Sequence, residues 1–277
     1  MAFHFIASTG RTATTYIAAA LNALPGVVAC HEGYAGSDKD AEPLLPLINL
    51  ENARAYQLPS SAEATVAEKR SPEIIADALA QSGAETLIDI AYYNPMFASA
   101  MLAAHPQAKM IGIIRDCESF VRSSTTLDGE DPMPVGWADP AKPLTRREEF
   151  IALGRIKPRR KTDDKAAWDG WSAIQRNIWL WRETNLRLIE AQSTFPERVL
   201  ILPFERLKQD PQHFWDAIAS HLDLPEISEK AHHGKGKFTN TKAFGYQIEA
   251  AAAWSADERQ LLHESVEQVE EKLAHVS

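Results

Sequence analysis

The stretch Ile6-Ala-Ser-Thr-Gly-Arg-Thr-Ala-Thr-Thr-Tyr16 joins an apolar segment to one that favours a helix. The apolar run of residues 3–7 is typical of a buried strand, and residues 14–24 are expected to form a helix that begins at two threonines. A strand-to-helix turn directs backbone N–H groups and the positive end of the helix dipole at one point, which favours a bound phosphate. The stretch therefore predicts an α/β fold with an anion-binding turn.

The turn offers side chains as well as backbone to a phosphate-bearing ligand. Arg11 supplies a permanent cation, and Thr14 and Thr15 supply hydroxyl donors on the first helical turn. It is not the standard ATP and GTP loop, G-x-x-x-x-G-K-[ST], because the cation is arginine and Ala13 stands where a glycine is expected. An ordinary capped turn is the alternative. The candidate ligand-binding residues are Ser8, Thr9, Gly10, Arg11, Thr12, Ala13, Thr14, Thr15 and Tyr16.

A second segment, residues 109–124, reads KMIGIIRDCESFVRSS. Its apolar run at 110–114 is typical of a central parallel strand, and Arg115 follows directly. Open α/β sheets bind ligands beyond the carboxyl ends of their strands, so Arg115 is placed to meet one. A surface ion pair of Arg115 with Asp116 or Glu118, worth little, is the alternative.

Short apolar runs and helix-forming segments alternate along the rest of the chain, which predicts a central parallel sheet flanked by helices. We expect one domain over residues 1–277, with loop insertions at about 33–61 and 128–165. Long loops in a compact domain tend to be functional or disordered. The expected strands lie near 3–7, 27–30, 86–90, 110–114 and 199–203. The expected helices lie near 14–24, 72–82, 95–104, 117–124, 168–192, 211–222 and 256–274.

Composition excludes several classes of protein. With 45% apolar and 24% charged residues, the chain is neither disordered nor a membrane protein, and no apolar run approaches the roughly 20 residues of a membrane span. The net charge of −9 argues against general affinity for nucleic acid. The two cysteines argue against a disulfide framework, and an expected core strand at the N-terminus leaves no room for a secretory signal. We therefore expect a cytoplasmic location.

A basic cluster interrupts this acidic composition. It reads RIKPRRK over residues 155–161. Such a run is usually a solvated loop. The functional alternative is a mobile lid that meets an anionic donor or an acidic acceptor.

Together, these segments resemble the sulfotransferase family, whose sulfonate donor is 3′-phosphoadenosine 5′-phosphosulfate (PAPS). Residues 11–16 resemble the family's 5′-phosphosulfate loop, with Ala13 in place of glycine. Arg115, with Ser123 eight residues later, is similar to its 3′-phosphate segment. The stretch RVLILPFERLKQDP of residues 198–211, followed by LDLP at 222–225, is similar to its late strand and helix end. The resemblance implies a P-loop-like sulfotransferase fold of the bacterial or carbohydrate branches.

The resemblance also implies roles for individual residues. Arg11 should neutralise the leaving phosphate, and the threonines at 14 and 15 should hold the 5′-phosphate. Arg115 and Ser123 should hold the 3′-phosphate, and Tyr16 should stack on adenine. A late basic stretch resembles the family's loop near the 3′-phosphate and adds two candidates, Lys235 and Lys237. The product would be 3′-phosphoadenosine 5′-phosphate (PAP), and no metal would be required.

The general base is less clearly marked. The histidine that many cytosolic members carry between the nucleotide motifs is missing here, whereas other branches often place a glutamate after the second strand. Glu32 occupies that position and is the candidate base, with the adjacent His31 as its rival. The lysine of the family's "D-K-x-P" segment is also absent, because Asp89 is followed by Ile90; the basic loop or the late lysines would replace it.

The expected function is sulfonate transfer from PAPS to a hydroxyl or amine of a small molecule or glycan. A P-loop kinase is one alternative, with Asp89 as a possible Mg²⁺ ligand. A nucleotide-binding protein without catalysis is another. The aromatic residues Tyr34, Tyr92, Tyr93 and Trp137 are candidate walls of an acceptor cleft. The sequence leaves the acceptor and the oligomeric state open.

Overall fold

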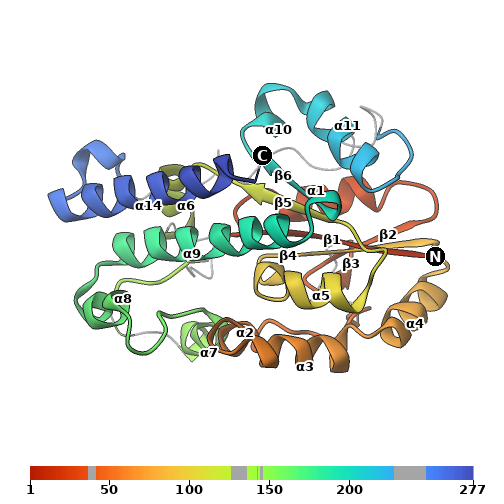
Figure 1. The fold of residues 1–277 in the computed structure, drawn as a ribbon, viewed down its shortest axis with the longest axis horizontal. Helices are drawn as coiled ribbons and strands as arrows, with labels where there is room; N and C mark the ends of the chain where they lie inside the picture. Colours follow the sequence, from red (N-terminus) through yellow and green to blue (C-terminus); the bar gives the residue numbers. More distant parts are fainter. Residues whose placement is uncertain (37–41, 126–135, 142, 144–145, 228–247, 277) are drawn as a thin grey trace.

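A six-stranded sheet forms the centre of the molecule (Figure 1). The computed structural model describes residues 1–36, 42–125, 136–141, 143, 146–227 and 248–276. The strand order is β3-β2-β4-β1-β5-β6, and β3 alone pairs antiparallel with its neighbour. The strands are β1 (Ala2–Ser8), β2 (Val27–His31), β3 (Tyr34–Ala35), β4 (Thr86–Ala91), β5 (Met110–Ile114) and β6 (Val199–Pro203).

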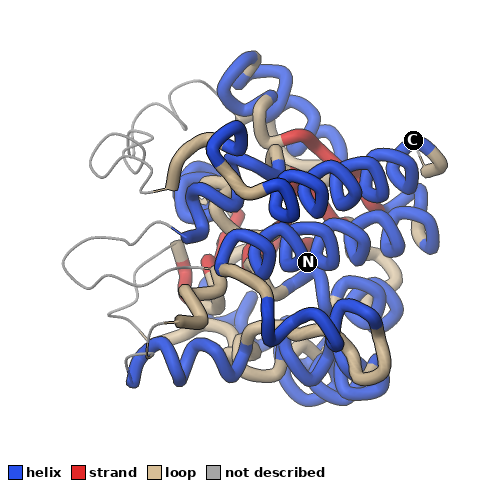
Figure 2. Tube along the Cα trace, turned by 90° about the vertical axis from the view of Figure 1, so that its left-hand side faces the viewer, coloured by secondary structure: helices blue, strands red, loops and turns tan. Residues whose placement is uncertain are grey.

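Helices cover both faces of the sheet, as the view of Figure 2 also shows. None of those in the described part of the chain is long and apolar enough to cross a membrane. Those before β5 are α1 (Thr14–Leu21), α2 (Asn52–Gln57), α3 (Pro59–Lys69), α4 (Pro72–Ser82), η1 (Asn94–Met96) and α5 (Ala98–Ala104). Those between β5 and β6 are α6 (Cys117–Thr125), α7 (Arg146–Gly154), α8 (Asp163–Ala167), η2 (Trp168–Gly170), α9 (Ala173–Thr194) and η3 (Pro196–Arg198). The last are α10 (Arg206–Gln209), α11 (Pro211–His221), η4 (Ala251–Ala253) and α14 (Ala256–Ala274).

Alternate residues of the strands build two cores. Phe5 of β1 lies in the core shared with α3, α5 and α9, whereas Ile6 lies in the core shared with α1 and α11. Because both faces are buried, the central strands read as continuous apolar runs, which is why the sequence revealed them. A third cluster joins α6, α9 and α14 through residues such as Phe120, Trp181 and Val269.

The fold confirms the predicted α/β class and the five predicted parallel strands. The predicted loop of residues 33–61 is partly wrong, because it contains β3, α2 and the first turn of α3. Similarly, α7 and α8 lie largely within the expected insertion at 128–165. Helices α2 and α3 bury polar side chains such as Asn52, Ser61 and Thr65, so their sequences show little apolar periodicity. The helix expected from residue 168 has a 3₁₀ turn there, and α9 itself begins at Ala173.

Candidate functional site

The turn between β1 and α1 is held in a strained conformation. Arg11 and Ala13 have φ of 57°, a left-handed value that L-residues avoid, and Gly10 has φ of 79°. Ala13 is the N-cap of α1, and no side chain caps this helix end. The first amides of a helix need an acceptor from outside it. Together, the strain and the uncapped end suit a turn that surrounds an anion.

The Ser8 side chain stabilises the turn through two hydrogen bonds. Its hydroxyl accepts hydrogen bonds from the Gly10 amide at 3.1 Å and from the Thr12 hydroxyl at 2.8 Å. Ser8 and Thr12 have no exposed surface. These two candidate ligands are therefore used inside the turn, whereas Thr14 is partly exposed and Thr15 is exposed.

The two segments that the sequence assigned to a nucleotide are in contact. Arg11 donates from Nε to the Ser123 hydroxyl at 2.8 Å. Arg115 in turn donates from Nη1 to the Arg11 carbonyl oxygen at 2.6 Å. Two guanidinium groups, one from each segment, thus lie at the carboxyl edge of β1 and β5, beside the start of α1. This edge has a local positive charge in a chain whose net charge is −9.

Arg115 is buried and fixed in position. Its Nε donates to the Ser119 hydroxyl at 3.0 Å, and its guanidinium lies 5.2 Å from the centroid of the Phe204 ring. The Trp181 indole donates to the Arg115 carbonyl at 2.7 Å. Among the described residues, the ion pair of Arg115 with Asp116 or Glu118 that the sequence suggested is not formed. Asp116 accepts from the Ser119 amide, and the Glu118 carboxylate lies 3.6 Å from the Arg122 guanidinium.

His31 lies on the α1 side of the site. Its Nε2 is 3.1 Å from the Thr14 hydroxyl and 3.4 Å from the Thr15 hydroxyl. The same Nε2 is 4.0 Å from the Glu32 carboxylate. A nucleophile–histidine–carboxylate triad needs the two partners on opposite ring nitrogens. The geometry therefore links His31 to the threonines and does not form such a triad.

Glu32 directly follows β2 and has a left-handed conformation, with φ of 54°. Gly33 follows with φ of 91°, and a Cβ there would lie 2.8 Å from a Leu47 methyl group, so a glycine is needed at this bend. Burial raises the pKa of Tyr92 to about 12, and the nearby Glu32 carboxylate contributes to that rise. The candidate base and Tyr92 therefore share one electrostatic environment.

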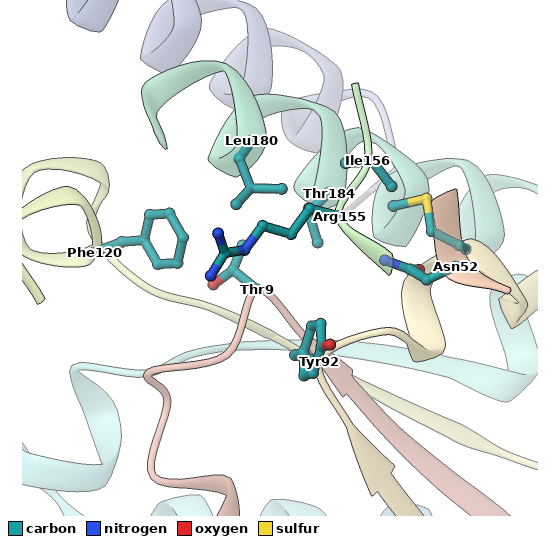
Figure 3. A pocket seen from close by; sticks show the side chains of 9 residues that line it. Thr9, Asn52, Tyr92, Phe120, Arg155, Ile156, Leu180 and Thr184 are labelled. Carbon is teal, nitrogen blue, oxygen red and sulfur yellow. The ribbon is translucent and has the colours of Figure 1, made fainter. Parts of the chain in front are cut away.

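A small pocket opens beside these residues, at the carboxyl ends of β1 and β4 (Figure 3). Figure 3 shows the Arg155 guanidinium between Phe120, Thr9 and Tyr92. Apart from Arg155, the described residues that line the pocket are uncharged. They are Thr9, Asn52, Tyr92, Met96, Phe120, Ile156, Leu180 and Thr184.

Asp89 lies away from this edge. It is in the middle of β4, fully buried, and its Oδ2 accepts from Nε of Arg70 at 2.8 Å. Arg70 also donates to the carbonyl oxygens of Pro46 and Lys69. The ion pair between Arg70 and Asp89 connects the end of α3 to β4. Ile90, where relatives would carry a lysine, is buried in the core beneath α1.

Of the remaining candidate residues, Tyr16 lies within the described part of the chain and the two late lysines do not. The Tyr16 ring lies 6.0 Å from that of Trp215, so one side of it already packs on α11. Lys235 and Lys237 lie outside the described residues. Within those residues no group of three or more histidine, cysteine or acidic side chains is arranged to hold a metal ion; metal independence stays a prediction.

Sequence reasoning missed two residues of the site. Ser119, which positions Arg115, had no signal beyond its place one turn after that arginine. Arg155 was read only as part of a charged run, which normally indicates solvent exposure. Its inward position becomes visible only once the pocket is assembled from six separate parts of the chain.

Comparisons with known proteins gave structural matches alone: no family model and no curated protein sequence matches this chain. A sulfotransferase from Alicyclobacillus acidocaldarius is 14% identical over 99% of this chain and 94% of that one, with a TM-score of 0.49. The sulfotransferase domain of the Synechococcus PCC 7002 olefin synthase is 14% identical over 96% and 94%, with 0.48. Mouse sulfotransferase SULT7A1, complexed with PAP, is 11% identical over 96% and 83%, with 0.41. These neighbours are sulfotransferases, the family whose motifs the sequence resembles.

Proposed function

We propose that this protein transfers a sulfonate group from PAPS to a hydroxyl or amine of a small molecule or glycan. The observation that carries the proposal is the contact between the two anion-binding segments, Arg11 to Ser123 and Arg115 to the Arg11 carbonyl. A donor with phosphates at both the 3′ and the 5′ position of its ribose needs two anion-binding sites close together.

The residues at this edge fit the donor's charges. The amides at the start of α1, with Thr14 and Thr15, would hold the 5′-phosphate. Arg115 would hold the 3′-phosphate, because a buried and oriented guanidinium binds an oxyanion through two parallel hydrogen bonds. Bound PAPS would supply an activated sulfur, whose bond to the 5′-phosphate oxygen breaks as the bond to the acceptor forms.

Arg11 would stabilise the leaving phosphate as negative charge develops on it. Its guanidinium is held by Ser123 at 2.8 Å, so it is already near the turn before the donor binds. A fixed cation of this kind lowers the barrier because it needs no reorganisation during the reaction.

Glu32 would take the proton of the acceptor. Its carboxylate contributes to the raised pKa of Tyr92, one of the residues that line the pocket. His31, in contrast, contacts the threonines of the donor side. We therefore assign proton transfer to Glu32 and donor positioning to His31.

The position of Asp89 does not support the kinase alternative, in which this carboxylate would bind Mg²⁺. A Mg²⁺ ligand must reach the phosphates at the strand ends, whereas this carboxylate is buried mid-strand and paired with Arg70. A binding protein without catalysis differs from the proposal only in turnover, so turnover is what the test must measure.

The test is transfer of radiolabelled sulfonate from PAPS to a panel of phenols, alcohols, amines and oligosaccharides, without magnesium. Glu32→Gln should lower the transfer rate by about 10²–10⁴-fold while PAP affinity stays within about twofold of wild type. His31→Asn is the neighbouring control, and it should mainly weaken PAP binding. Label transfer that persists in Glu32→Gln but is lost in His31→Asn at unchanged PAP affinity would reverse the two roles. PAP binding without any label transfer would favour the non-catalytic alternative.

A further inference from the structure

The Ser119 hydroxyl makes two hydrogen bonds in which it has opposite roles. It accepts from Nε of Arg115 at 3.0 Å and donates to the Asp116 carbonyl oxygen at 3.2 Å. A hydroxyl carries one proton, so its donation to Asp116 leaves a lone pair directed at the guanidinium. The Ser119 amide also donates to the Asp116 carboxylate at 2.8 Å. The first turn of α6 thus fixes both the place and the bonding direction of this hydroxyl.

The Arg115 guanidinium is held in one plane by contacts from different elements. Its Nη1 donates to the Arg11 carbonyl of the donor turn at 2.6 Å, and the Phe204 ring after β6 packs 5.2 Å from it. The Trp181 indole of α9 holds the Arg115 backbone at 2.7 Å. Either the Nε bond or the Nη1 bond alone leaves the plane able to turn. The bond from Ser119 to Nε therefore completes the orientation of this cation.

A guanidinium that is fixed in one plane selects the position of a phosphate as well as its charge. It binds an oxyanion through two parallel hydrogen bonds, and hydrogen bonds weaken steeply when their angle is poor. The 2′ and 3′ oxygens of a ribose are neighbours, but their phosphates leave the ring in different directions. An arginine that can turn follows either phosphate, whereas a fixed arginine satisfies the one that lies in its plane.

We propose that Ser119 makes the donor site select a 3′-phosphate over a 2′-phosphate, because it fixes the plane of Arg115. The inference rests on the proposed sulfotransferase function and adds the residue that decides which positional isomer of the nucleotide is accepted. Ser119 acts through Arg115, so it is a positioning residue: Arg115 supplies the charge and Ser119 its direction. Ser123, one turn further along α6, holds the other guanidinium, that of Arg11.

The test compares PAP with adenosine 2′,5′-bisphosphate, which carries the same phosphate groups on the same nucleoside. Their affinities are measured calorimetrically on the full chain. Wild type should prefer PAP by at least about tenfold, the effect of one well-made hydrogen bond to a charged group. Ser119→Ala should reduce the preference to within about threefold by weakening PAP binding, and Ser119→Thr, which keeps the hydroxyl, should retain most of it. Thr125→Ala is the control, because the Thr125 hydroxyl donates within the same helix, to the Val121 carbonyl at 2.7 Å.

The outcomes separate this proposal from the function on which it rests. Equal affinity of wild type for the two isomers, with PAP still bound, would overturn the selection and leave the donor site standing. A preference that survives in Ser119→Ala, or an equal loss of affinity for both isomers, would give Ser119 a structural role alone and also overturn the proposal. Failure of both isomers to bind wild type would instead contradict the sulfotransferase function, and this inference with it.

Discussion

At the scale of single residues, three of the five described non-glycine residues with left-handed φ lie where the chemistry is proposed; Lys161 and Asp223 are the other two. Arg11, Ala13 and Glu32 are left-handed non-glycine residues, and all three follow strands at the same edge of the sheet. Each such residue costs of order 1 kcal/mol, so the surrounding structure must impose the conformation. We interpret this strain as the means by which the donor turn and the candidate base are oriented.

Ala13 offers a direct test of that strain. Ala13→Gly should stabilise the fold by about 0.5–1 kcal/mol, because glycine adopts φ of 57° without steric cost. The measurement is the free energy of unfolding in urea. Ala76→Gly in the exposed, right-handed interior of α4 is the control and should destabilise by about 1 kcal/mol. Destabilisation at both positions would show that the turn is not strained at Ala13.

Much of the site could be predicted at this scale, but its orientations could not. Arg11, Arg115 and Ser123 follow from residue type and position at a strand end, and the structure brings these three together. The left-handed conformation of Ala13 had no signal, because alanine normally indicates helix. The inward direction of Arg155 depends on Asn52 and Trp137, which are far away in the sequence.

At the scale of elements, one wall of the pocket at the ends of β1 and β4 depends on how α7 ends against the segment before α2. Gly154 is the last residue of α7, and a Cβ there would overlap the carbonyl oxygen of Asn49. The same glycine carbonyl accepts from the Asn52 amide. Close backbone contact at Gly154 therefore sets the position of the adjacent Arg155.

Gly154→Ala should destabilise the protein by about 1–3 kcal/mol, because the added methyl group forces the two backbones apart. Gly170→Ala is the matched control, because a Cβ there meets no atom within 4 Å. Thermal unfolding of both variants measures the effect. An unchanged melting temperature in Gly154→Ala would contradict the contact.

The central strands were predictable as elements because burial on both faces leaves apolar runs in the sequence. Helices α2 and α7 were not, because they are held by contacts such as Asn52 to Gly154 rather than by an apolar stripe. The pair Arg70 and Asp89 was likewise invisible, since nothing in either segment names its partner. Tertiary contacts outweighed local pattern in each case.

At the scale of the whole molecule, the pH range of stability is set by three histidines, one buried in β1 and two half-buried at the ends of α5 and α11. Burial lowers the pKa of His4 to about 4, with Lys109 contributing, and it also lowers the pKa of His105 and His221. The folded state therefore binds fewer protons than the unfolded chain between about pH 4 and 6.5. Stability is full above pH 6.5 and falls as the pH drops through that window.

The free energy of unfolding should accordingly fall by on the order of 1–2 kcal/mol between pH 7.5 and 5 through His4 alone. His4→Asn keeps an acceptor for the Lys109 amide and does not titrate, so it should flatten the profile. His263→Asn, at an exposed position of α14, should leave the profile unchanged. Urea unfolding at several pH values measures all three. A wild-type profile that is flat from pH 7.5 to 5 would contradict the assignment.

The central claim for the whole molecule is that one edge of the sheet binds a nucleotide with phosphates at both its 3′ and 5′ positions. The most direct measurement is calorimetric binding of PAP, adenosine 5′-phosphosulfate and ATP without magnesium, on wild type and on Arg115→Ala. PAP and adenosine 5′-phosphosulfate differ by the 3′-phosphate and by the sulfate, so the change of their affinity ratio in Arg115→Ala, rather than the ratio in wild type, reports the 3′-phosphate.

We predict that wild type prefers PAP to both other nucleotides by at least about tenfold, and that Arg115→Ala removes the preference over adenosine 5′-phosphosulfate. Equal affinity of wild type for PAP and adenosine 5′-phosphosulfate, or a preference for PAP that survives in Arg115→Ala, would contradict the account.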